Sequence, residues 1–213
     1  MTTLNKTVSN FYKHNAENFS KTRNNPWPAT KAFLDSIDSG DSVLDIGCGN
    51  GRNLFYRSDI EITGLELSEE LCQIVKSRGG KVVCGNMINL PFEDNSFDFI
   101  ICIAVYHHLD NNEDRTKALK EMYRVLKPGG RVFIQVWAME QPISSRRKFL
   151  KRDTLVPWKN KDGTIMLRYY HIYPKGELEK EINDLSNKKN NFNFDIEVVL
   201  YEEGNHINVL KKI

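Results

Sequence analysis

Short apolar runs and longer amphipathic segments alternate along the chain. The apolar runs are rich in β-branched residues and have the lengths typical of strands. These predicted strands are Ser42–Ile46, Glu61–Glu66, Lys81–Cys84, Phe97–Ala104 and Arg131–Trp137, followed later by Phe194–Tyr201 and Ile207–Leu210. Strands that alternate with helices form parallel β-α-β units. The pattern therefore predicts an α/β fold with a mostly parallel, seven-stranded central sheet and helices on both faces.

The segments between the predicted strands have helical periodicity. One helix is expected to begin after Ser68, a residue type that caps helix N-termini, and to end at Gly79-Gly80. A second ends before Pro128, which cannot continue a helix. Residues 6–38 predict helices broken at Pro26-Trp27-Pro28, in a position to cover the mouth of a site.

The end of the first predicted strand carries the clearest chemical signal. Asp45 leads into a turn with glycines at positions 47, 49 and 51, and glycine lets the backbone bend tightly and approach a ligand closely. Because position 52 is Arg, the spacing is GxGxG rather than the dinucleotide pattern GxGxxG. The turn therefore favours a ligand that has no pyrophosphate and that presents a cationic end to Asp45.

Two further positions lie at predicted strand ends. Glu66 ends the second strand, where a carboxylate can accept hydrogen bonds from both hydroxyls of a ribose. Asn86 and Met87 follow the third strand, where a side-chain amide and a backbone N–H can contact an adenine ring. With LPFEDNSFDFI and LKEMYRVLKPGGRVFI, these features resemble the class I S-adenosylmethionine-dependent methyltransferase superfamily over residues 42–137.

The resemblance implies a Rossmann-like fold and S-adenosylmethionine as the cofactor. Many members have Asp where this chain has Asn86, and the Asn oxygen can still accept from the adenine amine. The cofactor-binding residues implied by the resemblance are Asp45, Gly47, Gly49, Gly51, Glu66, Asn86, Met87 and Ile103.

Length and composition predict one globular domain. The chain has 213 residues, of which 40% are hydrophobic and 27% charged. Its polar start shows no secretory signal, and no apolar run is long enough to span a membrane, so we expect no membrane association and a location in the cytoplasm, with the nucleus as a second site. Four well-separated cysteines lack the spacing of a zinc site. We expect four buried, reduced thiols and no bound metal.

Charge is concentrated in one stretch. Residues 144–171 contain eight Lys or Arg against two Asp, a net charge of +6, whereas the remainder of the chain has a net charge of −4. A basic segment on an acidic body is typical of a phosphate-facing surface. A solvated loop that keeps the protein soluble is an equally good interpretation of charge alone.

The flanks of the core resemble one family over essentially the whole chain, the eukaryotic tRNA wobble-uridine carboxyl methyltransferases. Relatives of that family include the methyltransferase domain of the AlkB-homologue tRNA hydroxylase. The segments that carry the resemblance are Phe19–Arg23, Pro26–Pro28, Ile103–His108, Trp137–Gln141, Ser145–Arg147, Val156–Trp158 and Arg168–Tyr173. The resemblance implies methylation of the carboxylate of 5-carboxymethyluridine in the tRNA anticodon loop, with a small zinc-binding activator subunit as partner. The chain departs from the family at His206, where an aromatic residue is usual.

The candidate residues suit a carboxylate substrate. A carboxylate is already ionised at neutral pH, so its methylation requires alignment and exclusion of water rather than a general base. The chain has no Asn-Pro-Pro-aromatic motif for methylation of an exocyclic amine. The predicted catalytic residues are Arg23, His107, Arg168 and His171, with His107 favoured over His108. The predicted substrate-binding residues are Arg146, Arg147, Lys148, Tyr169 and Tyr170.

These expectations divide the single domain into four parts. Residues 1–40 form a helical cover, 42–137 the cofactor-binding core, 138–175 a basic insertion on the substrate side, and 176–213 a closing helix and strands. Two alternatives remain: an O- or C-methyltransferase for small molecules with the same fold, and a non-catalytic binding subunit. The basic segment disfavours the first, and the intact glycines with both acids disfavour the second.

Overall fold

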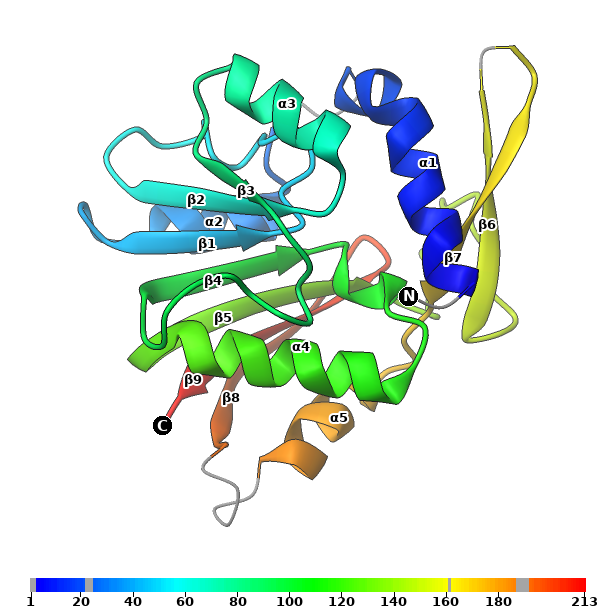
Figure 1. Ribbon diagram of the computed structural model, residues 1–213. Coiled ribbons are helices and arrows are strands. Elements are labelled where there is room, and N and C mark those ends of the chain that lie inside the picture. The colour runs from blue at the N-terminus through cyan, green and yellow to red at the C-terminus, as the bar shows by residue number, and fades with distance from the viewer. Residues whose placement is uncertain (1–2, 22–24, 161, 187–191) are drawn as a thin grey trace.

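A computed structural model of the chain describes residues 3–21, 25–160, 162–186 and 192–213. Its centre is a seven-stranded sheet in the order β3-β2-β1-β4-β5-β9-β8 (Figure 1). The strands of this sheet are β1 (Ser42–Ile46), β2 (Glu61–Glu66), β3 (Val82–Cys84), β4 (Phe97–Ile103), β5 (Leu126–Trp137), β8 (Phe194–Glu202) and β9 (Asn205–Lys212). Strands β3, β2, β1, β4 and β5 pair in parallel, and β9 pairs antiparallel with both β5 and β8. The predicted α/β fold is confirmed.

Five α-helices surround the sheet. They are α1 (Thr3–Ser20), α2 (Pro28–Asp35), α3 (Glu69–Ser77), α4 (Asn112–Val125) and α5 (Glu177–Leu185). Apolar cores form on both faces of the sheet, because strand side chains alternate between the two faces. One core joins the sheet to α2 and α3 through Leu34 and Val75, and the other joins it to α4 and α5 through Leu119 and Ile182. None of the helices in the described part of the chain is long and apolar enough to cross a membrane.

Local sequence explains where the helices begin. The side chain of Ser68 accepts a hydrogen bond from the backbone N–H of Leu71 at 3.3 Å, as expected for an N-cap. Asn111 caps α4 in the same way through the N–H of Asp114 at 2.8 Å. Pro28 occupies the first turn of α2, where no intrahelical partner for an N–H is needed.

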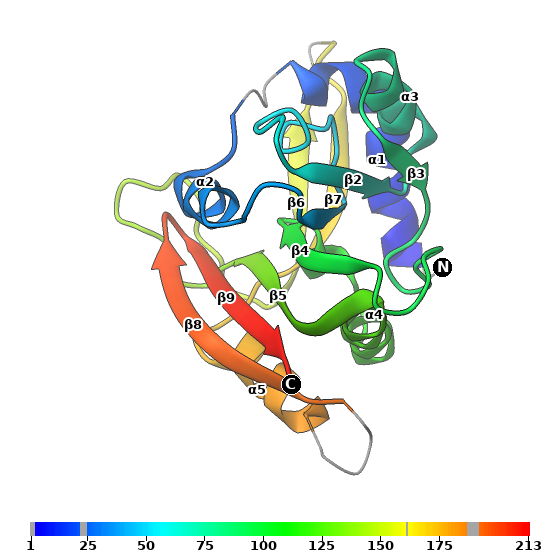
Figure 2. The same cartoon turned by 90° about the vertical axis from the view of Figure 1, so that its left-hand side faces the viewer.

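A second, two-stranded sheet lies outside the core. It is a hairpin of β6 (Asp153–Lys159) and β7 (Ile165–His171), which the sequence analysis treated as a basic insertion without strands. The charged residues and Pro157 conceal the strand pattern. In both views the hairpin lies beside α1, and together they cover one end of the sheet (Figures 1 and 2). This arrangement places β7 over the carboxyl ends of the parallel strands.

Candidate active site

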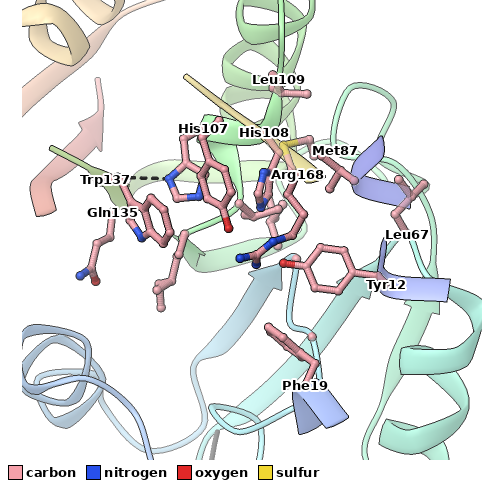
Figure 3. Close-up of a pocket in the computed structure, with 18 of the residues that line it drawn as sticks. Tyr12, Phe19, Leu67, Met87, His107, His108, Leu109, Gln135, Trp137 and Arg168 are labelled. Atoms are coloured by element: carbon pink, nitrogen blue, oxygen red, sulfur yellow. Dashed lines mark hydrogen bonds between the residues drawn. The ribbon is translucent and has the colours of Figure 1, made fainter. Parts of the chain in front are cut away.

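A cavity of about 1420 Å³ opens at the carboxyl ends of the parallel strands (Figure 3). Loops after β1 to β4 form its floor, whereas α1 and the hairpin form its roof. Ligands of open α/β sheets bind at this end of the strands. Pockets for one small ligand usually measure about 300–1000 Å³, so this cavity has room for two reactants side by side.

The glycine turn after β1 brings backbone into the cavity wall. Gly47 and Gly49 both line the cavity and have positive φ angles of 69° and 58°, which favour glycine. A Cβ atom on Gly47 would lie 2.5 Å from a methyl group of Val105. The turn can therefore close against the loop after β4 only with glycine at position 47.

Two buried carboxylates lie at the ends of β1 and β2. Glu66 accepts hydrogen bonds from the backbone N–H groups of Gly49 at 2.9 Å and Ser68 at 3.0 Å. Asp45 accepts one from the amide of Asn53 at 3.0 Å. Burial raises the pKa of both carboxyl groups, that of Asp45 to about 7. Neither carboxylate has an ion-pair partner within 4.0 Å among the described residues.

The raised pKa of Asp45 predicts that affinity for a cationic ligand rises with pH. Below pH 7 the carboxyl is mostly protonated, and a cation must displace that proton to bind the ionised form. Binding of S-adenosylmethionine should therefore strengthen by about tenfold between pH 6 and pH 8. Isothermal titration calorimetry measures this change, and an Asp45→Asn variant should bind weakly and with little pH dependence. A wild-type affinity that is constant over this range would contradict the assignment.

The remaining predicted cofactor residues fall on the same side of the cavity. Asn86, Met87 and Ile103 all line it, at the ends of β3 and β4. The Asn86 oxygen accepts a hydrogen bond from the backbone N–H of Ile88 at 3.2 Å, which fixes the side chain within its turn.

His107 lies on a short 3-10 helix, Tyr106–His108, directly after β4. Its Nδ1 accepts a hydrogen bond from the backbone N–H of Trp137 at 3.1 Å (Figure 3). An accepting Nδ1 carries no proton, so the neutral ring has its proton on Nε2. Burial, followed by the neighbouring His108, holds the pKa of His107 well below its usual value. His107 is therefore a neutral donor whose Nε2 has no partner among the described residues.

His108 also lines the cavity but has the opposite tautomer. Its Nδ1 donates to the backbone carbonyl of Tyr169 at 2.7 Å, which leaves Nε2 as an acceptor. Burial lowers the pKa of His108 to about 4. The 3-10 turn thus brings both histidines to the cavity.

Arg168 brings a buried positive charge into the cavity roof. The side chain is 6% exposed, and its guanidinium carbon lies 4.5 Å from the ring centre of Phe11, 5.2 Å from Trp158 and 5.3 Å from Tyr170. No carboxylate of the described residues forms an ion pair with it, and its Nε has no hydrogen-bond partner there. A buried cation that contacts aromatic rings and has no ion pair among the described residues is an incomplete site that an anion would complete.

The basic segment reaches the edge of the cavity. Arg146, Arg147 and Lys148 are exposed and line it. The guanidinium of Arg147 lies 4.0 Å above the ring centre of Trp137, and the opposite face of Trp137 stacks on Tyr170 at 4.2 Å with an angle of 10° between the rings. The segment thus joins the buried aromatic residues to the surface.

Comparisons with known proteins agree with this geometry. The family described as a methyltransferase domain matches residues 44–134. A tRNA (carboxymethyluridine(34)-5-O)-methyltransferase of Schizosaccharomyces pombe is 34% identical over 198 residues, which cover 83% of this chain and 86% of that protein. The chain belongs to this family. It is a family of class I methyltransferases, as the sequence analysis expected.

Two other proteins are similar to the chain, one in sequence and one in structure. A Mus musculus protein named "Probable tRNA methyltransferase 9B" is 42% identical over 151 residues, which are 71% of this chain and 33% of that protein. The chain thus spans about a third of the length of the first curated relatives that it matches. A Haloferax volcanii methyltransferase, solved in complex with the Trm112 methyltransferase activator, has a TM-score of 0.67 at 19% identity over 96% of each chain. The last similarity shows the shared fold.

The site fits S-adenosylmethionine, the cofactor of these methyltransferases. Two buried carboxylates that form no ion pair with any described residue match a ligand that has a protonated amino group, a sulfonium and ribose hydroxyls. Asp45 would face the cationic amino acid end, and Glu66 would face the ribose. Asn86 and Met87 would face the adenine, because they lie beyond Glu66 at the end of the next strand.

Three of the predicted site residues do not line the cavity in the structure. Gly51 does not line the cavity; its missing Cβ leaves room for Phe55 and Val75, which would be 3.1 Å away. Tyr169 and His171 project from the opposite face of β7 to Arg168 and Tyr170, because strand side chains alternate. Both contact Asp153 instead.

The structure also locates the other outlying predictions. Arg23 lies outside the described residues. His206 hydrogen-bonds to Glu140 at 2.9 Å, away from the cavity. His171 meets Glu177 and Glu181, with ligand-type atoms within 4.8 Å of one another. Glu181 there pairs with Arg115 at 2.9 Å, so a cation already neutralises this cluster.

The expectation of four buried, reduced thiols is wrong for one pair. Cys72 and Cys84 form a disulfide between α3 and β3, and Cys84 is exposed. Cys48 and Cys102 are free and buried, as expected. The sequence shows a separation of 12 residues between Cys72 and Cys84, but not that the α3–β3 connection folds back to join them.

Sequence reasoning missed several cavity residues. Tyr12 and Phe19 of α1 approach from the roof (Figure 3). Gln135 and Asn205 lie on the floor, at neighbouring ends of β5 and β9. A signal for Gln135 exists in the sequence, because it is a polar residue inside the apolar run RVFIQVW. No comparable signal marks the α1 residues, which reach the cavity only through tertiary packing.

Proposed function

We propose that this chain transfers the methyl group of S-adenosylmethionine to the carboxylate of 5-carboxymethyluridine at the wobble position of a tRNA anticodon loop, giving the methyl ester. The observation that carries the proposal is the buried Arg168, which has no ion-pair partner in the part of the chain that the structure describes. A cation buried among Phe11, Trp158 and Tyr170 suits a planar anion that accepts two parallel hydrogen bonds. The name of the S. pombe relative, a tRNA (carboxymethyluridine(34)-5-O)-methyltransferase, supports the same substrate.

The chemistry requires alignment rather than proton transfer. Bound S-adenosylmethionine supplies an electrophilic methyl group, and the ionised carboxylate oxygen forms the new bond to carbon as the bond to sulfur breaks. No proton moves, so the neutral state of His107 is an advantage. Its Nε2–H is available to hydrogen-bond the substrate, while the aromatic side chains keep water away from the reacting atoms.

The exposed basic segment is proposed to bind the tRNA backbone. Arg146, Arg147 and Lys148 lie at the cavity edge, outside the part that fits the cofactor. Each phosphate contact contributes to the salt dependence of binding. Replacing Arg146 and Lys148 with Ala should reduce the slope of log affinity against log salt by about 1–2. Filter binding of tRNA between about 50 and about 200 mM salt measures the slope, with cofactor affinity as the control. An unchanged slope would show that this segment does not contact the tRNA backbone and is a solvated loop.

The partner is proposed to be a small zinc-binding activator subunit that pairs with β3. This strand is an edge of the sheet and pairs with β2 alone. An exposed edge offers free backbone groups to a strand of another chain. The Haloferax volcanii neighbour, named for its complex with an activator, supports the choice.

The two edges of the sheet provide a matched test of this partner. Val83→Asp places a charge on β3, and Val199→Asp places one on β8, the opposite edge. The first should abolish co-purification with the activator, and the second should leave it intact. A Val83→Asp chain that still co-purifies, or a wild-type chain that is stable and fully active alone, would contradict the proposal.

The proposed reaction is tested with the chain, its activator, labelled S-adenosylmethionine and two synthetic anticodon stem-loops. One stem-loop carries 5-carboxymethyluridine and the other carries unmodified uridine. Label should enter the first and not the second. Equal labelling of both would show that the carboxylate is not the acceptor, and labelling of neither would disprove the assigned activity.

A further inference from the structure

Two buried amide side chains with unpartnered atoms lie on the cavity floor. Gln135 is fully buried near the end of β5, and Asn205 is 8% exposed at the start of β9. Among the described residues, the Gln135 Nε2 and the Asn205 Oδ1 have no hydrogen-bond partner. Buried polar atoms without partners are costly, so a site that contains two of them at a cavity requires an explanation.

The sheet register places the two amides together. Trp137 lies opposite Asn205 and Gln135 opposite Ile207 in the antiparallel β5–β9 pair. Because strand side chains alternate, Gln135, Trp137 and Asn205 all project from one face, and the two amides are diagonal neighbours across the strands. Figure 3 shows Gln135 and Trp137 side by side at the same end of the cavity.

Existing contacts determine which atoms remain for a ligand. The Gln135 Oε1 accepts from the Thr30 hydroxyl at 3.5 Å, so its amide N–H groups are the free donors. The Asn205 amide donates to the backbone carbonyl of Glu202 at 3.0 Å, so its carbonyl oxygen is the free acceptor. One free donor and one free acceptor thus lie diagonally across the β5–β9 pair on the same face of the sheet.

We propose that Gln135 and Asn205 recognise the Watson–Crick edge of the uracil base. Gln135 donates to a ring carbonyl oxygen, and Asn205 accepts the N3–H that lies beside it. Cytosine presents the reverse pattern there, an amine donor beside an N3 acceptor, so the pair selects uracil against cytosine. This inference rests on the proposed function, because it assigns the base that carries the reacting carboxylate.

The position of the two amides is compatible with a carboxylate bound at Arg168. The Tyr170 ring stacks on Trp137 at 4.2 Å and lies 5.3 Å from the Arg168 guanidinium. The two amides lie next to Trp137 in the sheet, and Arg168 lies next to Tyr170, so one stacked aromatic pair connects the two groups. A base extruded from the anticodon loop can place its edge at the amides and its 5-substituent toward Arg168, as enzymes that modify single bases do.

The test compares two stem-loops that differ only in the modified base, 5-carboxymethyluridine against 5-carboxymethylcytidine. Both carry the same carboxylate, so the contribution of Arg168 cancels in the ratio of their kcat/KM values. Misfolded enzyme also cancels, because both substrates meet the same preparation. The variants are Gln135→Met and Asn205→Leu, with Asn208→Leu as a matched control. Asn208 is also buried on β9 with an unpartnered oxygen, but it faces Glu179 on the other side of the sheet.

Wild-type enzyme with its activator should prefer the uridine stem-loop strongly. Each of Gln135→Met and Asn205→Leu should reduce the uridine-to-cytidine ratio by about tenfold, the effect expected for one buried hydrogen bond, and Asn208→Leu should not change it. Ratios unchanged in both variants, with an active wild type, would overturn this inference alone. A wild type that methylates neither stem-loop would overturn the proposed function and this inference together.

Discussion

Replacing Arg168 with Met is expected to lower kcat/KM for the 5-carboxymethyluridine stem-loop by about 100- to 1000-fold, the cost of losing the two charge-assisted hydrogen bonds that hold the carboxylate. Methionine preserves the packing against Phe11 and Trp158 but removes the cation. Affinity for S-adenosylmethionine should not change, because the cofactor residues lie on the floor of the cavity. Steady-state kinetics and calorimetry measure the two effects.

Two further variants make the Arg168 prediction specific. Arg168→Lys retains the charge without the planar fork, so its activity should lie between those of wild type and Arg168→Met. Arg131→Met removes a cation that pairs with Glu197 at 2.6 Å on the sheet surface, and its activity should equal that of wild type. If Arg168→Met kept most of its activity, Arg168 would be a packing residue and the carboxylate would bind elsewhere.

Gly47→Ala is expected to abolish cofactor binding and to destabilise the fold by about 2–4 kcal/mol, combining left-handed backbone strain with overpacking. The new methyl group would meet the Val105 side chain at 2.5 Å. Gly79→Ala is the matched control, because Gly79 has a similar φ of 82° but open space around its Cβ position. It should cost only about 1–2 kcal/mol and leave binding intact.

Chemical denaturation and calorimetry distinguish the two glycines. Adding Val105→Ala to Gly47→Ala should recover part of the stability, because it removes the methyl groups that clash. Equal effects of Gly47→Ala and Gly79→Ala would show that backbone strain alone matters at position 47. In that case the close approach of the glycine turn to the loop after β4 would have no energetic role.

Periodicity and strand ends predicted most of the core from sequence. Strands Ser42–Ile46 and Glu61–Glu66 agree with the structure at both ends, because an apolar run bounded by turns has few other interpretations. The cofactor-binding side of the cavity could be predicted for the same reason, because Asp45 and Glu66 lie at the ends of those two strands. The seven-stranded sheet, with helices on both faces, is also as predicted.

The substrate side was predicted less well, because it depends on tertiary contacts. Arg168, Tyr169, Tyr170 and His171 are consecutive residues, and all four are predicted to belong to the site. Only the knowledge that they form a strand shows that Arg168 and Tyr170 face the cavity while the other two face away. The basic residues of that segment conceal the strand pattern, so the sequence does not show which of its side chains share a face of the strand. Gln135 was missed for a different reason: Asn205, its diagonal neighbour in the sheet, is 70 positions away in the sequence and is brought near it only by the β5–β9 register.

The central claim is that the acceptor atom is a carboxylate oxygen, and the stability of the product tests it most directly. The chain and its activator are incubated with labelled S-adenosylmethionine and tRNA that contains 5-carboxymethyluridine, and the recovered tRNA is treated with dilute alkali. A methyl ester hydrolyses under these conditions, whereas methyl groups on ring carbon, ring nitrogen or ribose oxygen do not. The account predicts that the label is released as volatile methanol. Label that remains on the nucleoside would contradict it.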